Sequence, residues 1–313
     1  MATTCFIPLL GKRIRVTKLD TCGNVPAGAT ADSQLVTDGF ITVNLSSEVD
    51  DGAEIITKKA DGSLCVNEKL ASTFKRFTVG ITFCGVNPSL LAMVTNASSY
   101  NDYTVSNVAG IKVAEGAVDK NFALELWTGI SGAACLPGAA FLGGYVLLPN
   151  VKAGVLGDIS VDGENAISFS LTGAYTKGGN AWGVGPYNVL LNASSQPAGL
   201  PTALDPLDHL LLMQTSLTPP ASGCSPLPMP PYITSVSPTG GGIAGGTVTT
   251  VTGSGFTGAT AIQFGAGNAG TAFSVLSDTQ VRATSPAHAA GAVDIIVVKA
   301  GGNATKSAAF TYA

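Results

Sequence analysis

Charged side chains are scarce in this sequence. Asp, Glu, Lys and Arg make up 12% of its 313 residues, whereas a typical soluble domain has about 25%. The 16 basic residues are outnumbered by 20 acidic ones, which excludes a nucleic-acid binder that relies on excess positive charge. A hydrophobic content of 45% with a net charge of −4 is the opposite of a disordered composition. Such a folded chain either lies in a membrane or has much of its surface covered by other subunits.

An uninterrupted hydrophobic run that could span a membrane is also missing. The stretch 126–151 has no charged residue, but five glycines and two prolines divide it into pieces of strand length. The N-terminus does not have the pattern of a signal peptide, because its apolar stretch is short, contains Pro8 and precedes the basic residues. We therefore expect no membrane insertion and no export by this route.

Residue patterns of metal centres and hydrolases are absent as well. The two histidines are accompanied by no G-x-S-x-G motif. Asp205, Asp208 and His209 cluster, but this spacing fits the acidic first turn of a helix better than a metal or acid–base site. No cofactor, no metal and no enzymatic activity are predicted. No CxxC pair occurs and free, buried thiols are expected for the six cysteines, Cys5, Cys22, Cys65, Cys84, Cys135 and Cys224.

The distribution of charge divides the chain. Residues 1–76 hold nine basic and nine acidic residues, half of all charges, whereas residues 210–277 hold none. The neutral stretch includes a Pro-rich segment that is typical of an extended linker. We therefore predict a first domain at residues 1–217, a linker at 218–231 and a second domain at 232–313.

The first domain is predicted to be all-β, with one or two short helices. One helix begins at Asn87-Pro88-Ser89 and stops near Asn96, and a second is predicted over residues 205–212. In the strand at 12–18, Ile14, Val16 and Lys18 share one face. Alternating apolar and polar residues predict strands at 12–18, 40–45, 77–84 and 167–175, and Asp-Gly pairs predict turns at 61–62 and 162–163.

The polar segment at residues 48–76 is either a charged hairpin or a long loop. It can be read as a solvated extension. It can also be read as an arm that docks on a neighbouring subunit, with its mixed charges setting the register. The sequence alone leaves both interpretations open.

Residues 232–313 contain seven short strand-like segments separated by Gly-rich turns, which predicts an immunoglobulin-like β-sandwich without a disulfide. The segment from Pro231 onward resembles the IPT/TIG family. The resemblance implies an appended interaction or spacer module. The matching stretches are 231–238 (PYITSVSP), 245–247 (GGT), 251–256 (VTGSGF), 262–265 (IQFG), 277–281 (SDTQV), Pro286 and 309–312 (AFTY).

The first 230 residues resemble major tail (tube) proteins of long-tailed phages of actinobacteria, in the stretches 76–93 and 167–187. The resemblance implies a homo-oligomer of hexameric rings, stacked into a tube in the virion tail after assembly in the host cytoplasm. The lumen would hold the tape-measure protein and conduct DNA. A long loop would contact the adjacent ring, and segment 48–76 is the best candidate for it. The candidate contact residues are Lys58, Lys59, Asp61, Glu68 and Lys69.

A tube that lets DNA slide should not bind phosphates tightly. The 18 acidic against 13 basic residues before the linker fit a neutral or acidic lumen. Glu48, Asp50, Asp51 and Glu54 are the candidates for an acidic lumen patch, unless they lie in the contact between rings.

The second domain would then decorate the outside of the tube. There it would either bind host-surface glycans weakly, with avidity from several copies per ring, or only shield the tube and aid assembly. Two other classes were weighed for the whole chain. One is an adhesin that binds glycans through β-sandwich domains, and the other is a polysaccharide-active enzyme, for which the sequence has no recognisable pair of carboxylates.

Overall fold

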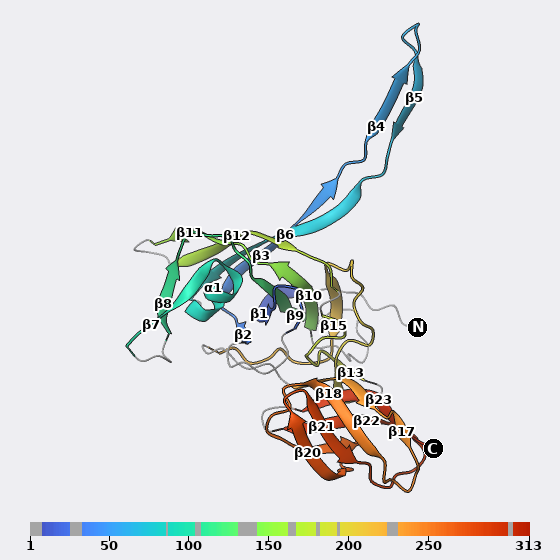
Figure 1. Cartoon of the computed structure of the whole chain (residues 1–313). Helices are drawn as coiled ribbons and strands as arrows, with labels where there is room; N and C mark the ends of the chain where they lie inside the picture. Colours follow the sequence, from blue (N-terminus) through green and yellow to red (C-terminus); the bar gives the residue numbers. More distant parts are fainter. Residues whose placement is uncertain are drawn as a thin grey trace.

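The structure is a computed structural model, and nearly all of its regular secondary structure consists of β-strands (Figure 1). The described residues are 8–25, 33–85, 87–103, 108–130, 143–161, 167–179, 182–192, 195–223, 231–299 and 303–313.

The first domain is built on a nine-stranded antiparallel sheet. Its strands are β1 Pro8–Leu19, β2 Gln34–Thr37, β3 Phe40–Asp50, β6 Thr73–Cys84, β9 Asn121–Ile130, β10 Gly143–Lys152, β11 Val155–Ser160, β12 Ser168–Thr176 and β15 Leu211–Thr215. The order in space is β2-β1-β9-β10-β12-β6-β3, with β11 beside β12 and β15 beside β10. Strands β10 and β12 pair only at Val151–Thr176 and Lys152–Tyr175, so the sheet opens between them.

Most of the sequence-based elements are confirmed. Three of the predicted strands lie within β1, β3 and β6, and the fourth, at 167–175, matches β12 except for its first residue. The uncharged stretch 126–151 contributes to β9 and β10. The helix predicted over residues 205–212 is wrong. The Asp208 carboxylate accepts the Asp205 amide at 2.7 Å, which closes a turn, and Leu211 onward pairs with β10 as strand β15. The predicted turn at 162–163 lies outside the described residues.

Each face of the sheet is covered by a hydrophobic core. On one face lies helix α1 (Pro88–Val94), whose N-terminus is capped by the Asn87 side chain, which accepts the Ser89 amide at 2.7 Å. Its buried Leu90, Leu91 and Val94 join the core that contains Ile14 and Val16. Successive side chains of a strand point to opposite faces of the sheet. Ile14 and Val16 of β1 are two residues apart and therefore point to the same core.

The opposite face of the sheet is covered by residues of the segments 182–192 and 195–204. Trp182 and Tyr187 from the first of these segments pack in one core with Trp127 of β9 and with Tyr145 and Leu147 of β10. The indole of Trp127 meets the Tyr145 ring edge-on, with the ring centroids 5.2 Å apart. The central strands are therefore buried on both faces.

The second domain is a β-sandwich. One sheet has the order β16-β18-β21-β20 and the other β17-β23-β22-β19. Their inner faces share one core that includes Val251, Phe264, Ile295 and Phe310. The bounds are β16 Tyr232–Ser237, β17 Gly240–Gly241, β18 Val248–Ser254, β19 Ala259–Phe264, β20 Thr271–Ser277, β21 Gln280–Thr284, β22 Gly291–Lys299 and β23 Ala304–Tyr312. This confirms the immunoglobulin-like sandwich.

Three short two-stranded pairs complete the structure: β4 Glu54–Lys58 with β5 Leu64–Lys69, β7 Ala97–Asn101 with β8 Val108–Val113, and β13 Leu190–Leu191 with β14 Pro197–Ala198. The β4–β5 pair projects far from the sheet, whereas the second domain lies at the other end of the first (Figure 1). No helix among the described residues is long and apolar enough to cross a membrane.

Candidate functional site

The most prominent surface feature is a protruding hairpin, residues 51–72, which we call the arm. At its root β3 and β6 are still paired, with Glu48 opposite Arg76 and Asp50 opposite Thr73. Beyond the root, β4 and β5 pair from Glu54–Lys69 to Lys58–Leu64, and every residue of both strands is exposed. Segment 48–76 is therefore a hairpin and not a long loop.

The tip of the arm is a tight turn. The Gly62 amide donates to the Lys59 carbonyl at 2.9 Å, and the Lys59 amide donates to the Ser63 carbonyl at 2.8 Å. Gly62 has a φ of 84°, which explains a glycine here. The Asp61 carboxylate accepts the Ser63 amide and hydroxyl, and these hydrogen bonds lower the pKa of Asp61. The predicted turn at 61–62 is confirmed.

The five candidate contact residues lie along this arm. Lys58 ends β4, Lys59 and Asp61 belong to the tip, and Glu68 and Lys69 face Ile55 and Glu54 across the hairpin. All five are exposed. Their role in a contact between rings stays a prediction.

The four acidic residues proposed for a lumen lie at the root of the arm. The Glu48 carboxylate binds Arg76, with Nε and Oε2 2.6 Å apart, and the hydrogen bond from Arg76 is the main reason that the pKa of Glu48 is lowered. Asp50 lies 3.4 Å from the Lys75 ammonium, and Asp51 accepts the Ser72 hydroxyl at 3.1 Å. Glu54 faces Lys69 across the hairpin. Basic side chains thus accompany this acidic cluster, and its placement on a lumen stays a prediction.

The sequence interpretation, which stressed charge, overlooked the apolar residues of the arm. Ile55, Ile56, Leu64 and Val66 are between 40% and 53% exposed. They lie on a two-stranded ribbon, and no other strand among the described residues pairs with it. The signal that could have revealed them is the run of β-branched residues in the sequence EIITK and of Leu and Val in LCVNEK.

Aromatic residues hold the root of the arm against the body. Phe74 and Phe77 of β6 have ring centroids 4.9 Å apart, and Phe74 also meets His209 edge-on at 5.3 Å. The His209 Nδ1 lies 2.7 Å from the Thr176 hydroxyl, which accepts the Phe77 amide. Burial lowers the pKa of His209. His209 thus supports the root of the arm.

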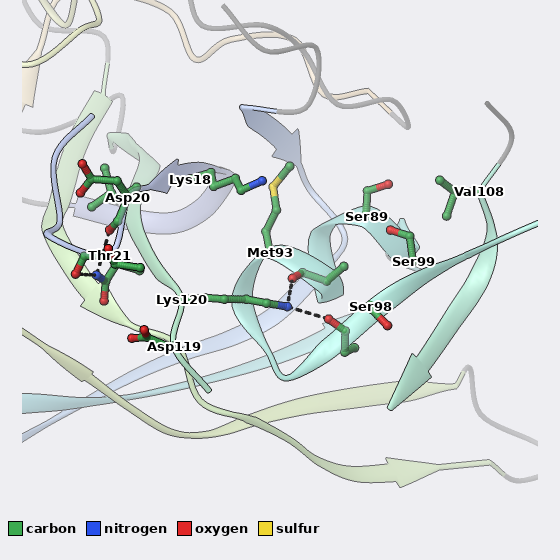
Figure 2. A pocket seen from close by; sticks show the side chains of 14 residues that line it. Lys18, Asp20, Thr21, Ser89, Met93, Ser98, Ser99, Val108, Asp119 and Lys120 are labelled. Carbon is green, nitrogen blue, oxygen red and sulfur yellow. Dashed lines mark hydrogen bonds between the residues drawn. The ribbon is translucent and has the colours of Figure 1, made fainter. Parts of the chain in front are cut away.

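A cavity of about 770 Å³ lies between the end of β1 and helix α1 (Figure 2). Its wall carries the amines of Lys18 and Lys120, the carboxylates of Asp20 and Asp119, and the amide of Asn121. The apolar part of the wall includes Leu19, Ala92, Met93 and Val108.

Two side chains of the cavity are fixed by backbone carbonyls. The Lys120 ammonium donates to the carbonyls of Ala92, Thr95 and Ala97 at 2.7–2.9 Å, at the C-terminal end of α1. Burial lowers the pKa of Lys120. The Asn121 Nδ2 donates to the carbonyls of Asp20 and Thr21, each at 3.0 Å. The Asn121 Oδ1 is buried, and no described residue forms a hydrogen bond with it.

A buried ion pair lies on the other face of the sheet. Arg15 donates to both oxygens of Glu125 at 2.6 Å, and the Tyr145 hydroxyl donates to Oε1 at 2.7 Å. The Arg15 guanidinium stacks 3.3 Å from the centre of the Tyr187 ring. Burial lowers the pKa of Arg15, but the Glu125 carboxylate outweighs it and the net pKa is raised. Every charge in this cluster is satisfied internally, so we assign it to the fold.

The two domains touch through Asn192, which follows β13. Its Nδ2 donates to the Asp294 carboxylate at 3.2 Å and to the Ser307 hydroxyl at 3.0 Å. A second cavity of about 570 Å³ lies beside this contact and is lined from both domains by Tyr187 and Tyr232. The second domain is thus docked on the first and not merely tethered to it.

Cys5, Cys135 and Cys224 lie outside the described residues. The three described cysteines carry free thiols. Cys22 and Cys65 are exposed and Cys84 is half-buried, so the expectation of burial is wrong for the first two. Cys22 lies in a surface turn and Cys65 lies on the arm. Within the described part of the chain, no group of three or more His, Cys, Asp or Glu side chains could hold a metal.

These features define a two-domain all-β protein with a protruding arm and a docked immunoglobulin-like sandwich. The sandwich is an IPT/TIG domain, since that family matches residues 231–313. No curated protein matches the chain.

Proposed function

We propose that the chain is a structural subunit that assembles with copies of itself, and that the assembly is the tail tube of a long-tailed phage. The single observation that carries the self-assembly is the arm, whose two strands β4 and β5 are exposed along their whole length, carry apolar side chains and pair with no other described strand. In this proposal the chain is not an enzyme and has no cofactor.

The arm is difficult to explain in a monomer. An isolated two-stranded hairpin is at best marginally stable in water. The arm is stabilised by its apolar side chains only when a partner covers them, and these side chains are Ile55, Ile56, Leu64 and Val66. Lys58, Lys59, Glu68 and Lys69 lie among them and would fix the register of the contact through charge pairing. A neighbouring copy in the next ring is the partner that a stacked assembly provides.

Ring closure would also explain the long edge strand β3. Its inner neighbour is β6, and among the described strands none pairs with its other edge. Ile41 and Val49 on this strand are more than half exposed. Open edges invite pairing with another chain, and lateral neighbours in a ring would cover them. The low charge of the chain agrees with such extensive coverage.

In the assembled tube, a hexameric ring would surround a lumen that holds the tape-measure protein and later conducts DNA. Glu48, Asp50, Asp51 and Glu54 would keep that wall from binding phosphate. Arg76 and Lys75, which pair with Glu48 and Asp50, offset part of this negative charge. The IPT/TIG domain would face outward in the virion tail.

Electron microscopy of the negatively stained full-length protein tests the proposal. We expect rings or tubes for the wild type. A variant in which residues 51–72 are replaced by Asn-Gly retains a short β3–β6 hairpin, and it should form rings that do not stack. Monodisperse wild-type monomers over a wide range of concentrations would contradict self-assembly.

A second candidate is an adhesin that binds glycans, and the IPT/TIG domain is the observation that favours it. Glycan arrays with the full chain and with a variant that lacks residues 232–313 separate the two functions. Binding by a monomeric full chain that is lost in the shortened variant would favour the adhesin. Tube formation by both proteins, with no glycan bound, would favour the structural subunit with a decorating domain.

A further inference from the structure

We propose that the groove between the two domains binds an acidic oligosaccharide, with the Tyr232 ring against a sugar ring and the Lys306 ammonium on a sugar carboxylate. The inference rests on the glycan binding weighed above and deepens it, because it adds the position of the ligand and its chemical class. It does not depend on the arm or on self-assembly. The groove runs along the seam between the domains, next to β13 (Figure 1).

The groove consists of two cavities that share one wall. Their volumes are about 570 Å³ and about 460 Å³, within the range of roughly 300–1,000 Å³ that is typical of ligand sites, which often lie between domains. Three residues from each domain line both cavities: Val184, Gly185, Pro186, Tyr232, Ile233 and Lys306. An elongated ligand such as an oligosaccharide can therefore occupy both cavities at once.

Tyr232 belongs to this shared wall. It is the first residue of β16, and its neighbour Ile233 points into the core of the sandwich. Successive residues of a strand point to opposite faces, so the Tyr232 ring is directed out of the sandwich and toward both cavities, where it is half-buried. A tyrosine in this position offers an apolar ring to the C–H face of a sugar and a polar tip to its hydroxyls.

The Tyr232 hydroxyl has no partner in the part of the chain that the structure describes. Burial raises the pKa of Tyr232, so the hydroxyl stays protonated at neutral pH and can donate. The side chain is only half-buried, and a ligand in the groove can therefore reach this hydroxyl. Tyrosine hydroxyls that are removed from water usually find a partner, and a sugar hydroxyl would supply one here.

Other polar groups of the wall suit the hydroxyls of a sugar. Amide and hydroxyl side chains can both donate and accept hydrogen bonds, which matches a ligand whose hydroxyls do the same. Asn188 of the first domain and Asn303 and Thr305 of the second line the larger cavity, and none of the three is fully buried. The groove thus offers hydrogen-bonding groups from both domains to one ligand.

The charge of the wall selects an acidic sugar. Arg15 and Lys306 are the charged residues that line the groove, and its described wall contains no Asp or Glu. Arg15 is already compensated by Glu125. The Lys306 ammonium donates to the Thr234 carbonyl at 3.0 Å, and no carboxylate among the described residues pairs with it. A carboxylate on the ligand would supply the counter-charge through a charge-assisted hydrogen bond.

The walls of the groove are held in place without a ligand. Beside the larger cavity, Asn192 donates to the Asp294 carboxylate and to the Ser307 hydroxyl, which fixes one domain against the other. A site whose walls are already in place loses less conformational freedom on binding. The variant that lacks residues 232–313 loses one wall of the groove and should not bind the ligand.

Isothermal titration calorimetry with the full-length protein tests the inference. The probes are trigalacturonic acid and the hyaluronan tetrasaccharide, which alternates glucuronic acid with N-acetylglucosamine. Each is compared with its carboxyl-reduced form, which is neutral and keeps the hydroxyls. We expect at least one acidic probe to bind roughly tenfold more tightly than its neutral form, as one charge-assisted hydrogen bond would give. Equal affinities for the two forms, or no binding of either acidic probe at millimolar concentration, would overturn the inference.

Variants of the two central side chains give the second test. Y232A and K306M should each weaken binding of the acidic probe by roughly tenfold, and K306R should restore most of it. Y232F keeps the ring and should lose only a few fold. The matched controls Y100A on β7 and R282M on β21 remove an exposed ring and an exposed cation outside the groove, and they should bind like the wild type.

A chemical block of the groove gives a third readout. N188C, in a full-length background without the native cysteines, is modified with a maleimide that fills the larger cavity, and S277C on exposed β20 is the control. Binding should be lost only in modified N188C. Glycan binding that survives in Y232A, K306M and modified N188C would overturn the groove and leave the adhesin candidate intact.

Two other outcomes are also decisive. No glycan binding in any assay would refute both the groove and the adhesin candidate, whereas the proposed self-assembly would stand. Binding of AMP instead of the oligosaccharides, with the same loss in Y232A and K306M, would overturn the assigned class of ligand.

Discussion

The buried ion pair of Arg15 and Glu125 gives the sharpest test of how the first domain is held together. In the variant E125Q, the side chain keeps its size and retains an oxygen that can accept the Tyr145 hydroxyl. The charge that compensates Arg15 is lost. The side chain of Arg15 is only 9% exposed, so its guanidinium would remain buried without a counter-charge.

The magnitude follows from the surroundings of Arg15. Breaking a buried ion pair from one side costs about 3–5 kcal/mol. The guanidinium keeps its contacts with the rings of Tyr187 at 3.3 Å and Trp127 at 4.9 Å, and such contacts stabilise a desolvated cation by about 2 kcal/mol. Because these contacts persist in E125Q, we expect a loss near the lower end, about 3 kcal/mol.

Urea unfolding followed by tryptophan fluorescence measures this loss. Both tryptophans of the chain, Trp127 and Trp182, lie in the core beside the ion pair, so the signal reports the first domain alone. With an m value of about 2 kcal/mol/M, the midpoint should fall by roughly 1.5 M. Protein concentration is kept constant because self-association changes apparent stability.

Two further variants decide whether the explanation is correct. D38N, which breaks the exposed pair with Arg13, should change the midpoint little. R15M/E125L removes both charges together and should recover most of the stability lost in E125Q. A midpoint for E125Q within 0.5 M of the wild type, or a double variant as unstable as E125Q, would refute the reasoning; this threshold is about a third of the expected shift.

Three other predictions concern single side chains. K120M should destabilise the first domain by about 1–2 kcal/mol, because three carbonyls lose a common donor. K112M, at an exposed position of β8, should leave the stability unchanged. Urea unfolding of both variants checks this. His209 has a lowered pKa in the folded state. Its neutral form therefore stabilises the domain above the unfolded pKa of about 6.5, and this contribution is lost as the pH falls further. In thermal unfolding from pH 7 to pH 5, the melting temperature of H209Q should fall less than that of the wild type. Burial raises the pKa of Asp278, but hydrogen bonds from Thr257 and Gly255 outweigh it and the net pKa is lowered. Calorimetry of D278A should show a lower melting temperature for the IPT/TIG domain than in the wild type. This difference should shrink as the pH falls below about 4, where the carboxylate becomes protonated.

Local chemistry made several elements predictable. Helix α1 was expected because Asn87 and Pro88 are residues that favour a helix start and an apolar stripe follows them. The Asn87 side chain does cap the helix. The tip of the arm was expected because Asp61-Gly62 fits a turn with positive φ. The wrong helix at residues 205–212 shows the limit of such signals. The side chain of Asp208 closes a turn there, and pairing with β10 extends the following residues as a strand.

Burial could not be predicted in the same way. The alternation in KRIRVTK places Arg15 on the face of β1 opposite Ile14 and Val16, but it does not say whether that face is buried. Residues of the segments 182–192 and 195–204 cover that face, so Arg15 is buried and needs Glu125, which is 110 residues away. Lys18 lies on the same face as Ile14 and Val16, as expected, but it lines a cavity instead of the core. The exposure of Cys22 and Cys65 was missed for the same reason.

By itself, the sequence determined the all-β class, the helix after Asn87, the tip turn and the IPT/TIG domain, because these depend on residues that are close together in the chain. Only the tertiary structure decided that residues 51–72 stand free as an arm and that the opposite face of the sheet is covered. It also brought Asn121, Asp20 and helix α1 around one cavity. Those outcomes depend on which distant segments pack together, and alternation of apolar and polar residues along one strand carries no information about them.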